Sequence, residues 1–260
     1  MKMIRIAASF CLLVAMAFPA AAVKVRVTGA EAVRQLTDAG GTVIAEYESF
    51  SIMEADAAAV AALGGAAEAL DDRIRLNAGA VDPSSAEARA ARRAAAGFAG
   101  KRLHLVQFAG PVKPEWYDEL AATGARIVSY IPDNAYLVYS DSDGVTRLQA
   151  NQARRAYIQW EGAYADADKI QPGARTTDAQ GKARAIGTEL FSIQMVADPE
   201  ANAETLALVD TLQLAPIRSR SENTRLGFLN VTVALPADRL ADLAARPDVV
   251  SIHPYFPPRK

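Results

Sequence analysis

Apolar and polar positions along the chain follow a regular order of elements, which is clearest between residues 101 and 170. Residues 102–108 alternate apolar and polar side chains, as a half-buried strand does. Pro114 suits the first turn of a helix, because its missing N–H has no partner there in any case. Gly124 is placed to end that helix. The segment therefore begins as a strand followed by a helix.

The rest of this segment predicts two more strands, a second helix and a closing strand. Residues 126–131 and 135–139 are rich in β-branched and aromatic side chains and are separated by a turn signal. Val145 and Leu148 are three residues apart and mark the inner face of a helix. Residues 157–160 are predicted to close the segment as a strand, which gives the order βαββαβ.

The same order is predicted in the segments before and after this one. In the first segment the expected strands and helices are 23–27, 30–39, 42–47, 50–53, 56–63 and 72–76. In the last segment they are 189–196, 203–212, 217–220, 227–233, a helix opened by Pro236, and 249–252. A period of about 80 residues is too long for a solenoid repeat, so small domains in series are predicted.

The sequence therefore predicts an α+β protein of three tandem βαββαβ units with antiparallel sheets. Each unit would follow the ferredoxin-like plan, with both helices on one face of a four-stranded sheet. The predicted divisions are a first unit at 23–76, a linker at 77–100 with a partly helical stretch at 84–95, a second unit at 101–170, a linker at 171–185, a third unit at 186–256 and a tail at 257–260.

This plan leaves one face of each sheet to meet water, a sister unit or a partner. In the second unit, alternate strand positions carry Tyr130, either Tyr136 or Tyr139, and Trp160. Such aromatic side chains suit a protein-binding surface. Sealing the junction with a neighbouring unit is an equally good interpretation of the same pattern.

Residues 1–22 have the pattern of a signal peptide. Lys2 and Arg5 give a basic start, 10–18 is apolar, and the small residues 20–22 precede a predicted cleavage after Ala22. A membrane anchor is the alternative, but the apolar run is shorter than the roughly 20 residues that a spanning helix needs. We expect a secreted or periplasmic protein that no longer contacts the membrane. Its one cysteine, at position 11, would leave with the signal, so no disulfide is expected.

Neither charge nor motifs predict nucleic-acid binding or catalysis. The net charge is −2, whereas a nucleic-acid surface usually needs a basic face. His104 and His253 have neither a second histidine nor an acidic partner at ligand spacing, so no metal site is expected. No nucleophile elbow and no glycine-rich phosphate loop is present. We expect a protein without catalytic residues, metal or cofactor.

Two runs in the second unit carry a resemblance to a known family. Residues 106–116 and 124–138 resemble the region ahead of the catalytic domain in bacterial secreted subtilisin-like serine peptidases. Residues 247–252 resemble the last strand of the propeptide fold of that family, and 253–260 resemble the junction that enters the peptidase domain. The family's Asp-Thr-Gly, His-Gly-Thr and Gly-Thr-Ser-Met-Ala segments are absent, so the chain is expected to be either a truncated prepro-region or a stand-alone relative.

The resemblance implies a non-catalytic, propeptide-like protein that templates folding of a peptidase and blocks its cleft. Its partner would be a subtilisin-like serine peptidase domain, in cis or in trans. The bare sheet face would pack on the enzyme, and the tail would lie extended in the substrate groove. The residues predicted to contact the partner are Tyr130, Tyr136, Trp160, His253, Tyr255 and Phe256. The alternatives are a stand-alone extracellular scaffold, and beyond it a small-ligand-binding repeat or an unrecognised enzyme.

Overall fold

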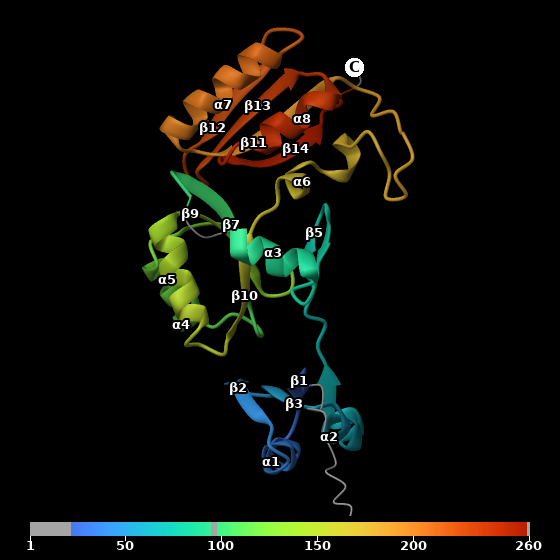
Figure 1. Ribbon diagram of the computed structural model, residues 1–260, viewed down its shortest axis with the longest axis vertical. Helices are drawn as coiled ribbons and strands as arrows, with labels where there is room; N and C mark the ends of the chain where they lie inside the picture. Colours follow the sequence, from blue (N-terminus) through green and yellow to red (C-terminus); the bar gives the residue numbers. More distant parts are fainter. Residues whose placement is uncertain (1–21, 95–97, 259–260) are drawn as a thin grey trace, which may run out of the picture. The chain divides into compact units, whose positions relative to one another are not determined.

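The computed structural model describes residues 22–94 and 98–258, so the predicted signal peptide falls almost wholly outside the described residues. The predicted α+β class with antiparallel sheets is confirmed (Figure 1). The chain divides into two compact units, Met1–Leu70 and Asp71–Lys260. They are called unit 1 and unit 2 below, and each has its own hydrophobic core.

Unit 1 is a single four-stranded antiparallel sheet with its helices packed on one face. Its elements are β1 (Ala22–Val27), α1 (Ala30–Asp38), β2 (Thr42–Glu46), β3 (Ser51–Asp56), α2 (Ala57–Ala62) and β4 (Ala67–Ala69). The strand order is β2-β3-β1-β4. Val25 and Val27 of β1 share the core with Leu36 of α1 and Met53 of β3. Asp56 caps α2 by accepting hydrogen bonds from two backbone N–H groups.

The strand predicted to close this sheet at 72–76 is wrongly placed. The closing strand is β4, whose Ala-Glu-Ala sequence has no β-branched residue and so gives almost no strand signal. Residues Ile74–Leu76 form β5, which pairs with β6 (Gly79–Val81) as a hairpin of unit 2. Ile74 is fully buried there, so a strand at this position is correct but the sheet assigned to it is not.

The first sheet of unit 2, called sheet C, matches the clearest part of the sequence pattern. It comprises β7 (Lys101–Phe108), β8 (Arg126–Ile131), β9 (Ala135–Asp141) and β10 (Ile158–Ala163), with α4 (Pro114–Ala122) and α5 (Ser142–Gln152) between them. The strand order is β10-β7-β9-β8, and all neighbours are antiparallel. Pro114 opens α4, and Asp141 caps α5.

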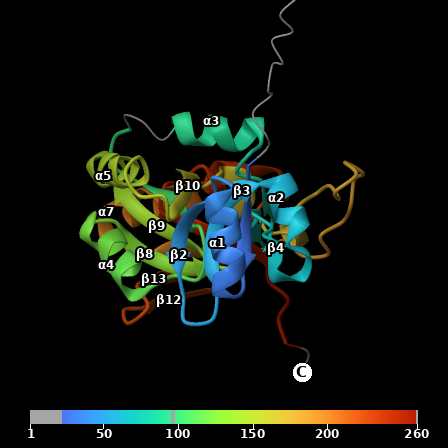
Figure 2. The same ribbon diagram turned by 90° about the horizontal axis from the view of Figure 1, so that it is seen from below.

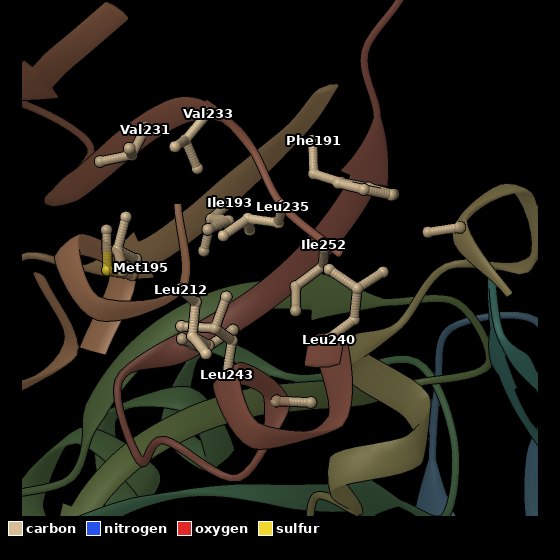
Figure 3. Close-up of a cluster of buried hydrophobic side chains, with 14 of the residues drawn as sticks. Phe191, Ile193, Met195, Leu212, Val231, Val233, Leu235, Leu240, Leu243 and Ile252 are labelled. Carbon is tan, nitrogen blue, oxygen red and sulfur yellow. The ribbon is translucent and has the colours of Figure 1, made fainter. Parts of the chain in front are cut away.

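The second sheet of unit 2, called sheet D, has the order β12-β13-β11-β14. Its elements are β11 (Leu190–Val196), α7 (Pro199–Leu212), β12 (Ser219–Asn223), β13 (Phe228–Ala234), α8 (Leu240–Ala244) and β14 (Val249–Pro254). Phe191 and Ile193 of β11 belong to one buried cluster with Leu212 of α7 and Leu240 and Leu243 of α8 (Figure 3). Between the sheets the chain forms α6 (Asp166–Lys169) and a 3₁₀ turn at Pro172–Ala174.

The face of sheet C opposite α4 and α5 is covered from within unit 2. One apolar cluster joins Leu105 and Trp160 of this face to Ile74 of the hairpin, Ala88 of α3 (Ala86–Ala94) and Val250 of sheet D. Figures 1 and 2 show α3 running alongside β10. The stretch predicted as a linker at 77–100 therefore holds β6 and α3, both of which pack on sheet C.

Candidate functional site

The most distinctive surface of unit 2 is the face of sheet D opposite α7 and α8, which sheet C covers only at one end. Strand register places two rows of short polar side chains across all four strands. The first row is Ser219, Thr232, Ser192 and His253, and the second is Ser221, Asn230, Gln194 and Ser251. We call these eight residues the polar face.

Burial separates the two faces of sheet D. Phe191, Ile193 and Met195 of β11 are fully buried on the helix side, while Ser192 and Gln194 between them are half-buried. On the polar face, the Gln194 Nε2 atom donates a hydrogen bond to Asn230 Oδ1 at 3.2 Å. Amide and hydroxyl groups of this kind keep further hydrogen-bonding capacity for a partner. The middle of this face is therefore polar, while Thr232 is buried and Val196, at the end of the face, joins the apolar cluster on sheet C.

The chain leaves this sheet as an exposed tail. The Tyr255 backbone N–H still donates to the Leu190 carbonyl at 2.8 Å, and its carbonyl accepts from Thr188 Oγ1 at 3.2 Å. Beyond it, Phe256 is 59% exposed, and residues 256–258 have no regular secondary structure. The predicted contact residues Tyr255 and Phe256 thus lie where the sheet ends.

His253 belongs to both features, because it is the last polar-face residue before the tail. Its side chain is exposed on β14, opposite Ser192. Partial burial nevertheless lowers the pKa of His253 from its usual range, since the charged imidazolium loses some of its hydration. The ring is therefore favoured in its neutral form, which offers one donor and one acceptor.

Tyr130 and Tyr136 lie elsewhere, on the α4 side of sheet C. The Tyr136 ring meets Tyr130 at 5.5 Å and Tyr117 of α4 at 5.7 Å, both edge-on. Tyr130 is 55% exposed, so this aromatic cluster reaches the surface. The prediction that Tyr130 and Tyr136 share a sheet face with Trp160 is wrong, because Tyr136 contacts Tyr117 of α4 and Tyr130 packs on Tyr136.

Trp160 is not on an exposed surface at all. It is 4% exposed, as is Tyr139, and both belong to the cluster that also contains Val196 and Val250 of sheet D. Of the two interpretations of the aromatic strand positions, sealing of a junction is the one that describes Trp160 and Tyr139. Trp160 is buried because the β5–β6 hairpin and α3 cover the face of sheet C that the sequence pattern predicted to be bare.

A buried acid–base pair in sheet C escaped the sequence analysis. His104 Nε2 lies 2.6 Å from Glu161 Oε2, and Glu161 is fully buried. The Arg92 Nε of α3 donates to the other carboxylate oxygen at 2.9 Å. The partners are separated by 57 and 69 residues, so no local spacing could have revealed them. The trio joins α3 to β7 and β10.

Within residues 22–94 and 98–258, His, Cys, Asp and Glu side chains form no group of three or more that could hold a metal ion. No helix of this described part is both long and apolar enough to cross a membrane.

Residues 75–165 match the model of a family described as a domain of unknown function, DUF8729. The matched range runs from the β5–β6 hairpin through α3 and all of sheet C. No curated protein matches the chain.

Proposed function

We propose that this chain is the non-catalytic propeptide region of a secreted subtilisin-like serine peptidase, acting as a folding template and as an inhibitor that blocks the cleft. The observation that carries the proposal is the partly exposed polar face of sheet D, which continues directly into the exposed tail. The sequence resemblance at 247–260 falls on the same strand and tail. One surface thus joins a docking face to an extended segment.

The three βαββαβ segments, one in unit 1 and two in unit 2, are proposed to follow the ferredoxin-like, propeptide-like plan. Each of the three four-stranded sheets has the closing strand of its segment beside the first, then the third, then the second. The element order in each segment is strand, helix, strand, strand, helix, strand, apart from short 3₁₀ turns. This shared order supports the plan in all three segments.

The tail suits a peptidase groove for conformational reasons. An extended segment binds a groove by adding a strand, with backbone hydrogen bonds for affinity and side-chain pockets for specificity. Pro257 and Pro258 restrict the backbone to extended angles, so less entropy is lost on binding. Phe256 offers an exposed aromatic side chain for a pocket. The polar face would then hold the body of the inhibitor against the enzyme surface.

Inhibition of a purified subtilisin-like peptidase by residues 23–260 tests the proposal. Removal of 255–260 should raise the inhibition constant at least about tenfold, the equivalent of losing about 1.4 kcal/mol of binding free energy. Ser251→Arg, which places a bulky charge on the polar face, should weaken inhibition as well. Thr211→Arg, on the exposed side of α7, is the matched control and should leave inhibition unchanged.

Inhibition that survives both the truncation and Ser251→Arg would contradict the proposed mode of action. Absence of inhibition with every subtilisin-like peptidase tried would favour the second candidate function.

That second candidate is a stand-alone extracellular scaffold. The observation that favours it is the exposed cluster of Tyr117, Tyr130 and Tyr136, which belongs to sheet C and α4 and which cleft blocking by sheet D would not use. Tyrosine is enriched at protein interfaces because its ring packs while its hydroxyl remains hydrogen-bonded. A partner that binds wild-type protein but not Tyr130→Ala would support this function.

A further inference from the structure

We propose that unit 2 carries a binding cleft for a small organic cation, formed by the β5–β6 hairpin, α3 and β10. A cavity of about 470 Å³ lies between these elements. This volume is within the usual range of small-molecule sites, about 300–1,000 Å³. The cleft is separate from the polar face and the tail, and it does not depend on the function proposed above.

The floor of the cleft is apolar and aromatic. Leu105 of β7, Ala88 of α3 and Trp160 of β10 line it and are all buried. The indole ring lies across Gly162, where an added Cβ would come within 2.4 Å of two ring carbons. Glycine at this position therefore allows the ring its place on the floor. Such a floor accepts the hydrocarbon part of a ligand.

Trp160, which lines the cleft, also has a buried hydrogen-bond donor with no acceptor among the described residues. This donor is the Nε1 atom of a side chain that is 4% exposed. Buried polar atoms nearly always have a partner, and an exception calls for an explanation such as a missing ligand or water. The indole face is in addition the best aromatic surface for a cation.

The rim of the cleft is acidic. Asp82, Glu87 and Asp168 line it, and among the described residues no lysine, arginine or histidine does. Burial raises the pKa of Asp168, and the nearby Arg175 opposes this effect only in part. The negative charge of the carboxylate is therefore not fully balanced by positive charge within the protein. A cation placed beside Asp168 would supply the missing charge. The same carboxylates would repel an anion of equal size.

These features together define the ligand class. An apolar stem or ring would rest on Leu105 and Trp160, and an ammonium or guanidinium group would face Asp168. The described residues contain no group of three or more His, Cys, Asp or Glu side chains that could hold a metal ion, so a bare metal ion is not the expected occupant. We expect a primary amine on a short hydrocarbon or aromatic body.

Tryptophan fluorescence of the full chain gives a direct test. The chain has two tryptophans, and Trp116 stacks on Tyr157 in the α4 layer, so Trp116→Phe leaves Trp160 as the single reporter. Titration with phenethylammonium should change this fluorescence saturably. Phenylacetate, of similar size and opposite charge, and neutral 2-phenylethanol should each bind at least about tenfold more weakly, since a hydrogen-bonded charge pair supplies that much affinity.

Two variants in the Trp116→Phe background locate the site. Asp168→Asn should weaken phenethylammonium binding about tenfold, while Glu222→Gln on β12, an exposed control that removes the same charge, should not. Ala80→Phe places a large ring on the exposed hairpin wall and should abolish binding. Circular dichroism checks that each variant is folded.

Absence of saturable binding of phenethylammonium would overturn the proposal. Equal affinity for the three probes, or unchanged affinity in folded Asp168→Asn, would overturn it too.

Discussion

At the scale of single residues, Glu161 is the most consequential side chain of sheet C. It is fully buried and bonds His104 on one oxygen and Arg92 on the other. A buried carboxylate loses its hydration, so it is tolerated only where such partners replace the lost water. The trio also fixes α3, one wall of the proposed cleft, against β10.

Glu161→Ala should therefore lower the free energy of unfolding by about 3 kcal/mol, because it leaves a buried histidine and one end of an arginine without their partner. Urea unfolding followed by tryptophan fluorescence measures this change. The matched control is Asp242→Ala, since Asp242 pairs with Arg239 at a site where both side chains are more than a third exposed. Its loss should cost about 1 kcal/mol or less. Equal losses in the two variants would contradict the assigned role of Glu161.

His253 should make stability depend on pH in a defined direction. Its folded-state pKa is lowered by burial, so the unfolded chain binds the proton more readily. Its contribution to stability is present above about pH 6.5, the ordinary histidine value, and is lost as pH falls towards the folded-state pKa. His253→Gln should lose less stability than wild type between about pH 7.5 and pH 5.5. NMR titration of the imidazole should give a pKa below about 6.5. A pKa above that value would reverse the sign and contradict the prediction.

At the scale of elements, the sequence predicted where strands and helices lie better than it predicted which strands pair and which elements cover each sheet. Residues 102–108 were correctly assigned as a strand, because alternation is a local property. The same rule placed a strand at 72–76 but could not show that it leaves unit 1 and pairs with β6. Likewise, Trp160 was recognised as a strand aromatic, but its cover comes from α3 and the hairpin. The alternation of apolar and polar residues determines which side chains of a strand share a face. Which elements cover that face depends on segments distant in sequence.

Sheets C and D are joined by an element-level contact that sequence did not suggest. Arg126 of β8 donates through its guanidinium to the carbonyls of Ala197 and Gly227, at 2.9 and 2.6 Å. Gly227 has a φ of +71°, and an added Cβ there would lie 1.6 Å from Arg126 Nη2. The turn before β13 therefore favours glycine for its backbone conformation, and an added Cβ would in addition displace the Arg126 guanidinium.

Gly227→Ala should accordingly lower the free energy of unfolding of unit 2 by more than the strain of an alanine at positive φ alone. Gly181→Ala is the matched control, because Gly181 has a φ of +77° and nothing within 4 Å of an added Cβ. The control should lose about 1 kcal/mol from strain, and Gly227→Ala about 1 kcal/mol more from displacement of Arg126. Urea unfolding by tryptophan fluorescence compares them. Losses that agree within about 0.3 kcal/mol would show that the Arg126 contact contributes nothing.

At the scale of the whole molecule, the sheets differ in how many faces they leave free. Sheet C is buried on both faces, by α4 and α5 on one side and by the hairpin, α3 and sheet D on the other. Sheet D is buried on one face, whereas its other face meets sheet C at one end and carries partly exposed polar side chains beyond it. The proposed docking function thus belongs to sheet D, and the proposed cleft to the cover of sheet C. Residues 75–165, which match the family model, hold the second of these features almost entirely.

The division into two units predicts that unit 1 unfolds without unit 2. Unit 1 has its own core, in which Met53 is fully buried, and a domain of that size is only marginally stable. Both tryptophans lie in unit 2, so fluorescence reports unit 2 alone, whereas far-ultraviolet circular dichroism reports both units. Met53→Ala should cost about 3 kcal/mol through lost burial and a residual cavity. We expect it to shift an early part of the circular dichroism transition and to leave the fluorescence midpoint unchanged. A parallel shift of the fluorescence midpoint would mean that the two units unfold as one cooperative body.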